Sequence, residues 1–139
     1  MKGFWGILVL VALATAAFIY LTRPPKIEEK SLEESQTDGR LIARYWLDQA
    51  KKDQLDNMKK ACVDSAMNQS ELILKEIQKA EIALGLPFTE YALFTMGGGG
   101  ALKAVLSGEE DGRSGILMQI TLIMTEKEGK WYVSKITPE

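Results

Sequence analysis

The 139-residue chain has 17 lysines and arginines, 19 aspartates and glutamates, one cysteine and no histidine. This length supports a single domain, and the residues present cannot form an intrachain disulfide or the usual zinc, copper and haem ligand sets. Only 3 of the 17 basic residues lie at or before Lys26, and all 19 acidic residues follow it, so the remainder carries 14 minus 19, or −5. We therefore expect no cofactor, no metal centre and no nucleic-acid partner.

Residues Gly3 to Thr22 form an uncharged, predominantly apolar stretch. With a rise of about 1.5 Å per residue, a helix of this length spans about 30 Å, which is the thickness of the hydrocarbon core of a bilayer. Trp5 near one end and Tyr20 near the other occupy positions where aromatic rings settle among lipid headgroups. We predict that residues 1–26 form a transmembrane signal anchor. The alternative is a signal peptide cleaved at residues 14–16, Ala-Thr-Ala.

The direction of this helix is not decided by charge, because Lys2 precedes it and Arg23 and Lys26 follow it. The opening Met-Lys, followed at once by an apolar run, is typical of a secretion-type anchor. We therefore expect a single-pass protein of the inner (cytoplasmic) membrane with its domain on the extracytoplasmic, or periplasmic, side. Ala12 and Ala16 have the small-xxx-small spacing that allows two membrane helices to pair.

Residues 27–38 are mostly polar and are predicted to be a tether between the membrane and a soluble domain over residues 39–139. Thr37 or Asp38 can cap the first helix of that domain. The apolar side chains of this helix fall on one face, which indicates an amphipathic helix packed on a core. They are Leu41, Ile42, Tyr45 and Trp46.

A second helical stretch is predicted from apolar residues spaced three and four apart. They are Leu55, Met58, Cys62 and Ala66. Cys62 has no histidine that could activate it as a nucleophile, so we interpret it as a core residue.

The third helix has the clearest signals. Asn68 with Glu71 three residues later predicts the N-cap, and Gly85 followed by Pro87 predicts the end of the helix. One stripe is expected to face the core, namely Ile73, Ile77, Ala80 and Leu84.

After Gly85 the hydrophobic period changes to that of strands. The predicted strands cover residues 91–96, 102–106, 116–125 and 131–136. The third should bury an apolar face made of Ile116, Met118, Ile120, Leu122 and Met124. Short connections favour antiparallel neighbours, so the predicted class is α+β, with about three helices on one face of an antiparallel sheet of about four strands.

Two conspicuous loops have simple structural interpretations. Gly97 to Gly100 could let backbone amides approach an anion, but Lys103 does not complete a phosphate-binding loop, and a flexible connection between strands is favoured. The acidic run Glu109 to Asp111 does not match a calcium-binding loop and is interpreted as a solvated hairpin tip.

One group of residues could line a ligand pocket, with a carboxylate available as a general acid or base if it is buried. The candidates are Tyr45, Trp46, Asp48 and Tyr91. The alternative is that these aromatic residues pack the core beside a surface aspartate. The sequence assigns no catalytic residue.

Leu84-Gly85-Leu86-Pro87 ends the third helix, glycines recur at residues 97–100, 108, 112 and 115, and Gly129-Lys130-Trp131 comes late in the chain. Over about residues 69 to 137, together with the membrane helix, this pattern resembles the small, singly anchored domains of the cytochrome oxidase assembly factor family, which is related to the mitochondrial inner-membrane translocase accessory subunit. The resemblance implies a non-enzymatic scaffold or chaperone for a membrane complex, with no catalytic residues to transfer.

A second resemblance is to the nuclear-transport-factor-two-like (cystatin-like) fold, in which helices precede a curved sheet that closes as Gly-Lys-Trp-x-Val. Here that segment is Gly129-Lys130-Trp131-Tyr132-Val133. That fold hosts simple binding domains as well as pocket enzymes. The sequence therefore leaves two hypotheses: an assembly module with a membrane-protein partner, and a small-molecule pocket domain that could be enzymatic.

Overall fold

The computed structural model describes residues 30–96 and 100–139. The predicted membrane anchor, its direction and the Ala12 and Ala16 pairing site lie outside the described residues and stay predictions. Within the described ranges, no helix is both long and apolar enough to span a membrane.

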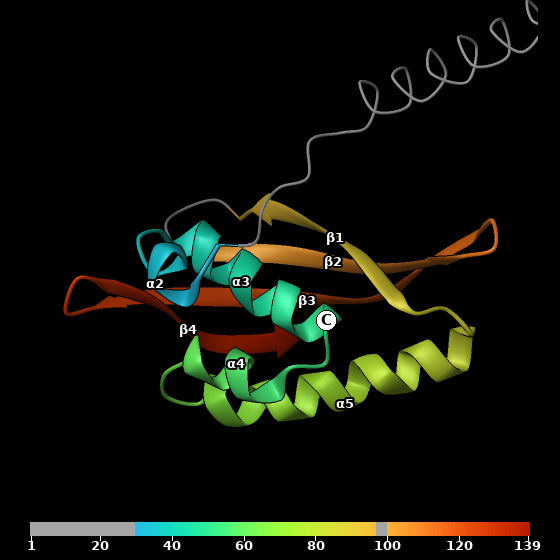
Figure 1. Cartoon of the computed structure of the whole chain (residues 1–139), viewed down its shortest axis with the longest axis horizontal. Helices are drawn as coiled ribbons and strands as arrows, with labels where there is room; N and C mark the ends of the chain where they lie inside the picture. The colour runs from blue at the N-terminus through green and yellow to red at the C-terminus, as the bar shows by residue number, and fades with distance from the viewer. Residues whose placement is uncertain (1–29, 97–99) are drawn as a thin grey trace, which may run out of the picture.

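The described chain begins with helices and ends with strands, and the helices pack against the sheet (Figure 1). The helices are α2 (Leu32–Ser35), α3 (Gly39–Lys51), α4 (Leu55–Lys60) and α5 (Ala66–Leu84). The strands are β1 (Phe88–Thr95), β2 (Ala101–Glu110), β3 (Arg113–Lys127) and β4 (Lys130–Pro138). They form one antiparallel sheet in the order β1-β2-β3-β4. The predicted α+β class and the four-stranded antiparallel sheet are confirmed.

The predicted tether differs from the structure in its last part. Residues 32–35 form α2, with Ser31 as its N-cap, and Ser35 and Gln36 are buried against the domain. The carbonyl oxygen of Gln36 also accepts a 2.9 Å hydrogen bond from the amide of Trp131 on β4. Residues from α2 onward therefore pack with the rest of the described chain.

Helix α3 begins where its cap was predicted. The Asp38 carboxylate accepts hydrogen bonds from the amides of Arg40 (2.7 Å) and Leu41 (3.4 Å), which satisfies donors that have no partner inside the helix. The buried face of this helix contains Trp46 and Leu47, both fully buried. This helix therefore supplies the largest side chain of the core.

The predicted second helix is too long. Helix α4 ends at Lys60, and the next residues run beside β4, where the Val133 amide donates to Ala61 and the Val63 amide donates to Val133, both at 2.9 Å. Cys62 and Val133 form an isolated parallel bridge. The spacing of apolar residues continued across this break because the bridging segment also faces the core.

The end of α5 is as predicted and its start is not, while the predicted stripe faces the core except at Leu84. The helix begins at Ala66, so Asn68 lies inside it, and Gly85 terminates it in the left-handed conformation with φ of 67°. Ile73 and Ile77 are buried as expected. Leu84 is exposed because the chain turns there, and Leu86 enters the core in its place.

The predicted faces of β3 are correct only over its second half. Ile120, Leu122 and Met124 are buried, but Ile116 is exposed and Leu117 is buried. The pairing with β2 shifts by one residue, since Leu106 pairs with Met118 and Ser107 with Ile116, which leaves Leu117 as the extra residue of a bulge. A bulge reverses the alternation of faces and leaves no clear signal in the pattern.

The two tight hairpins have turns of two residues with positive φ. Asp111-Gly112 joins β2 to β3, and Glu128-Gly129 joins β3 to β4, with φ between 51° and 79°. This geometry matches the right-handed twist of paired strands. The acidic run Glu109 to Asp111 is thus at an exposed hairpin tip, as predicted. Of the glycine run, residues 97–99 lie outside the described ranges.

Candidate functional site

Of the predicted pocket residues, the structure brings together Asp48 and Tyr91. The phenol of Tyr91 on β1 donates a 2.7 Å hydrogen bond to the Asp48 carboxylate on α3. Lys51, one turn further along α3, lies 3.8 Å from the same carboxylate and 5.3 Å above the Tyr91 ring. The group joins the edge of the sheet to the helix that covers it.

Asp48, Tyr91 and Lys51 together form a fixed contact between α3 and β1. Burial raises the pKa of the Tyr91 phenol well above its usual value, the hydrogen bond to Asp48 raises it further, and Arg44 opposes this rise. The phenol is therefore protonated at neutral pH, and its proton is held by Asp48. An arrangement of this kind stabilises the helix–sheet contact.

Trp46 lies apart from this group, in the core. Its indole nitrogen donates a 2.9 Å hydrogen bond to the hydroxyl of Ser70 on α5, and that hydroxyl donates to the Ala66 carbonyl at 2.7 Å. The Cys62 sulfur lies 3.3 Å from the same hydroxyl. Trp46 therefore serves as a packed and hydrogen-bonded core residue. The fourth candidate, Tyr45, packs against the core while partly exposed.

Cys62 occupies the position expected of a structural cysteine. It is buried, and its thiol donates to the Met58 carbonyl at 3.1 Å. Burial raises the pKa of the thiol to about 11, although the Ser70 and Trp46 side chains lower it in part. The reactive thiolate is therefore scarce at neutral pH.

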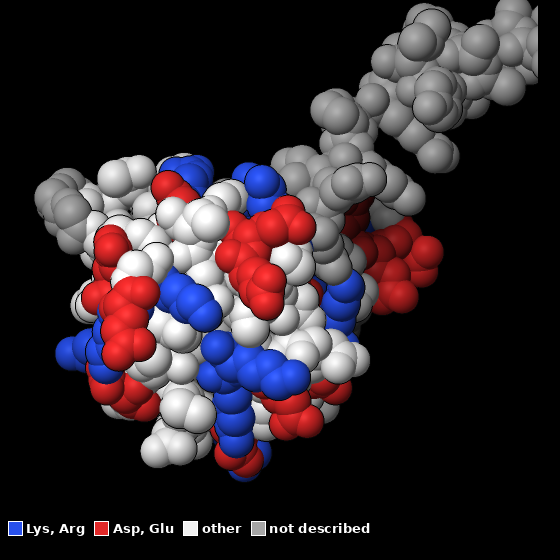
Figure 2. Space-filling view, turned by 60° about the vertical axis from the view of Figure 1, so that its left-hand side comes forward, with Lys and Arg blue, Asp and Glu red and all other residues white. Residues whose placement is uncertain are grey.

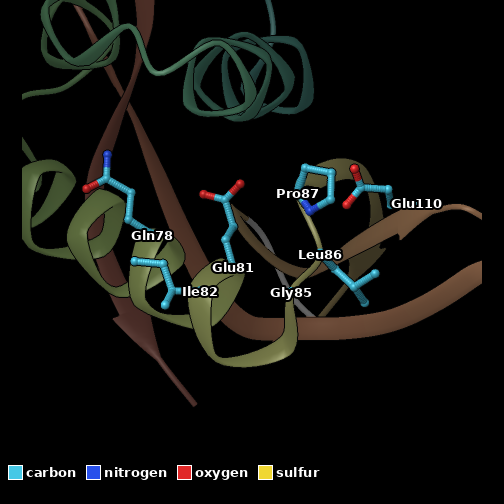
Figure 3. Close-up of a pocket in the computed structure, with 7 residues that line it drawn as sticks. All are labelled: Gln78, Glu81, Ile82, Gly85, Leu86, Pro87 and Glu110. Atoms are coloured by element: carbon cyan, nitrogen blue, oxygen red, sulfur yellow. The ribbon is translucent and has the colours of Figure 1, made fainter.

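Two of the hollows on the described part of the surface are lined by residues other than Asp48 and Tyr91. The larger, about 500 Å³, lies beyond the end of α5, with Gln78 and Ile82 on one side and Pro87 and Glu110 on the other (Figure 3). Ile82 at its rim is 83% exposed. The Glu81 carboxylate in this hollow accepts a 3.0 Å hydrogen bond from the Phe88 amide. That carboxylate is already engaged in fixing the start of β1.

The smaller hollow, about 300 Å³, lies where the start of α3 meets the sheet. Its lining includes Asp38, Arg40, Thr95, Met124 and Trp131. The Asp38 carboxylate caps α3, and Arg40 contacts β1. Sequence reasoning did not predict either hollow, because each depends on residues that only the folded chain brings together.

The described ranges contain no group of three acidic, cysteine or histidine residues placed to hold a metal ion. Acidic and basic side chains are interspersed over the face viewed in Figure 2. Exposed ion pairs among the described residues include Lys127 with Asp64 at 3.2 Å and Lys103 with Glu139 at 3.0 Å. Pairs of this kind contribute little to stability.

The sheet face opposite the helices is the remaining candidate. Its side chains come from register positions such as Phe94, Lys103 and Thr121 in one row across three strands, with Ala101 and Ile123 paired in the neighbouring row. Phe94 is 54% exposed and Ile123 is 37% exposed. This face is therefore a mixed surface of apolar, threonine and lysine side chains.

No protein-family model matches the chain, and no curated protein is detectably similar to it.

Proposed function

We propose that this protein is a non-enzymatic, membrane-anchored interaction module that helps to assemble a membrane protein complex, as the resemblance to the cytochrome oxidase assembly factor family implies. The observation that carries the proposal is the sheet face opposite the helices, because apolar side chains exposed together favour contact with another protein.

Three exposed apolar residues lie close together at one end of that face, while Ile116, also exposed, lies toward the other end. Met96 continues β1 and bonds through its amide to Ala101, which pairs with Ile123, while Phe94 lies in the next row. Phe94, Met96 and Ile123 are all exposed. We call these three residues the outer apolar patch. A partner that covers it would remove these side chains from water, which is favourable at about 25 cal/mol per Å².

The described polar groups offer little to an enzymatic function. Asp48 and Tyr91 satisfy one another, Cys62 is buried, and Glu81 and Asp38 are occupied with backbone amides. An active site needs a group that is free to exchange a proton or to attack a substrate. These engaged groups favour a binding role.

The second part of the proposal is that the domain is anchored in a membrane. The uncharged run from Gly3 to Thr22 supports a single membrane-spanning helix, and the expected setting is the inner membrane with the domain outside the cytoplasm. A reporter fused after Glu139 tests the direction. Activity of a reporter that works only outside the cytoplasm is expected, and activity confined to a cytoplasmic reporter contradicts it.

Crosslinking in native membranes, followed by identification of the captured proteins, tests the assembly function. Recovery of subunits of one membrane complex is expected. Recovery of none, at a level where the chain itself is readily detected, contradicts the proposal.

A second candidate function rests on the smaller hollow. Its position between α3 and the sheet is where a nuclear-transport-factor-two-like domain would bind a small molecule, and Trp131 from the Gly-Lys-Trp segment lines it. This candidate predicts that small molecules with a flat apolar part stabilise the purified chain against heat. The Gly39→Val variant tests it, because a Cβ at Gly39 already lies 3.2 Å from the Trp131 ring and a larger side chain would fill the hollow.

A further inference from the structure

The two edges of the sheet differ in how their backbone groups are satisfied. On β4, the amide of Trp131 bonds to Gln36, that of Val133 to Ala61, and that of Ile136 to the side chain of Gln69 at 2.7 Å. Pro138 at the end of β4 has no amide hydrogen to offer. These contacts close the β4 edge against strand pairing.

On the β1 edge, in contrast, several backbone groups point away from the sheet. The amide of Met96 bonds to Ala101 on β2, so residues at even positions direct their backbone groups into the sheet. Because backbone groups alternate along a strand, those of Tyr91, Leu93 and Thr95 point away from it. The Arg40 guanidinium confirms the direction, since it reaches the outward carbonyl of Leu93 at 3.4 Å, and that contact is exposed.

Basic side chains line this edge. Arg40 and Lys51 of α3 contact β1 at Leu93 and Tyr91, and Arg44 lies close enough to Tyr91 to affect its pKa. The carboxylates near this edge are engaged or lie on its other face. Asp48 is bonded to the Tyr91 phenol and paired with Lys51, Asp38 caps α3, and Glu90 of β1 pairs with Ser107 on the face opposite the helices. On the helix side of this edge, three basic side chains therefore accompany two carboxylates that are already engaged, in a domain with more acidic than basic residues.

We infer that the edge of β1 at Tyr91, Leu93 and Thr95 accepts an extended, acidic segment of a protein partner as a fifth strand. This inference rests on the proposed function and names the kind of segment that the module binds. The added strand takes the place of Arg40 at the Leu93 carbonyl, and its new backbone hydrogen bonds supply affinity. Acidic side chains that alternate along the segment meet the released Arg40 and Arg44. The other face of the added strand continues the surface that carries Phe94.

Repulsion between like charges argues against a second copy of this chain as the occupant of the β1 edge. An antiparallel pair of β1 strands centred on Leu93 would place two equivalent α3 helices side by side, with Arg40 and Arg44 of each facing those of the other. Like charges placed opposite one another are unfavourable. An acidic segment removes this repulsion and replaces it with attraction.

The experiment is residue-resolved amide hydrogen exchange on the full chain in mild detergent, with a synthetic peptide of about ten residues in which glutamate and valine alternate. Slower exchange at Tyr91, Leu93 and Thr95 on adding the peptide is expected, with little change at Phe94. A lysine–valine peptide is the control and should leave exchange unchanged. Equal protection by both peptides, or by neither, overturns the inference.

Matched variants test the backbone contribution. Thr95 is exposed, and Thr95→Pro removes an outward amide that β2 does not use, so the fold should survive as proline is tolerated at such an edge position. We expect Thr95→Pro to weaken peptide binding by up to about tenfold, because one hydrogen bond to the peptide is lost. Thr95→Ala should bind the peptide as the original chain does. Equal binding by Thr95→Pro and Thr95→Ala contradicts strand addition.

Two further results separate the alternatives. Protection of the same three amides without peptide, rising with protein concentration, would identify a second copy as the occupant and overturn the inference. The double variant Arg40→Glu, Arg44→Glu should reverse the preference between the two peptides. Because these measurements use purified chain and peptide, they can fail while membrane crosslinking still identifies an assembly partner, and the reverse also holds.

Discussion

The phenol of Tyr91 donates a 2.7 Å hydrogen bond to the carboxylate of Asp48, which lies 43 residues earlier in the chain. This bond joins β1, at the edge of the sheet, to α3, which also supplies the central tryptophan of the core. Several measurable properties depend on this contact and on the buried group around Ser70.

Replacing Tyr91 by Phe removes the hydroxyl and keeps the ring. We expect the free energy of unfolding to fall by about 1 kcal/mol, since Asp48 is partly exposed and keeps its contact with Lys51. Urea denaturation followed by tryptophan fluorescence measures this as a lower midpoint with an unchanged slope. Asp48→Asn, which keeps an acceptor for the phenol, should cost less than Tyr91→Phe. A larger loss for Asp48→Asn would contradict this role of the bond.

Alkaline pH should destabilise the domain through the same residue. The pKa of Tyr91 is raised in the folded chain, first by burial and then by the bond to Asp48, so the folded state holds this proton more tightly than the unfolded state. Its contribution to stability is therefore complete below the ordinary tyrosine pKa of about 10 and declines as pH rises above it. Urea midpoints measured from pH 8 to pH 11 should fall less steeply for Tyr91→Phe. Parallel curves for the two proteins would count against this prediction.

Ser70→Ala should lower the stability of the domain by more than the removal of one small hydroxyl group suggests. The variant leaves the buried indole N–H of Trp46 without its acceptor, and an unsatisfied buried donor costs about 1–3 kcal/mol. Thermal unfolding measures the loss as a lower Tm. Ser114→Ala on the exposed part of β3 is the control and should leave the Tm nearly unchanged. Equal Tm values for the two variants would show that the Trp46 hydrogen bond contributes nothing.

Cys62 should report on unfolding. Because it is buried and its thiol pKa is raised to about 11, iodoacetamide at pH 8 should modify it only when the chain opens. We expect labelling in water to be slow and to accelerate across the urea transition. Rapid labelling of the native chain, at the rate of a free thiol, would show that the packing around Ser70 and Met58 is open.

Gly108→Ala should be poorly tolerated. A Cβ at this position would lie 2.3 Å from the Pro87 carbonyl oxygen, a backbone atom that cannot move without displacing the start of β1. We expect a loss of at least about 2 kcal/mol. Gly115→Ala meets only the end of the Leu86 side chain at 3.2 Å and should cost less. Urea denaturation compares the two variants. A larger loss of stability for Gly115→Ala than for Gly108→Ala would contradict this packing.

Local signals predicted much of the fold. The Asp38 cap, the left-handed Gly85 and the alternation along the strands each depend on neighbouring residues, so the sequence reveals them. The bulge at Leu117 and the bridge between Cys62 and Val133 depend on residues far apart in the chain. Of the predicted pocket residues, Asp48 and Tyr91 do meet, but Trp46 faces the opposite side of α3, toward the core.

The central claim is that the sheet face opposite the helices contacts a protein partner in the membrane. The most direct test places a photo-crosslinking amino acid at Ile123, in the outer apolar patch, and as a control at Leu72, an exposed apolar residue of α5. Illumination of native membranes is expected to give a specific product with a membrane-complex subunit from position 123 and not from position 72. Equal products from both positions, or none from position 123, would contradict the account.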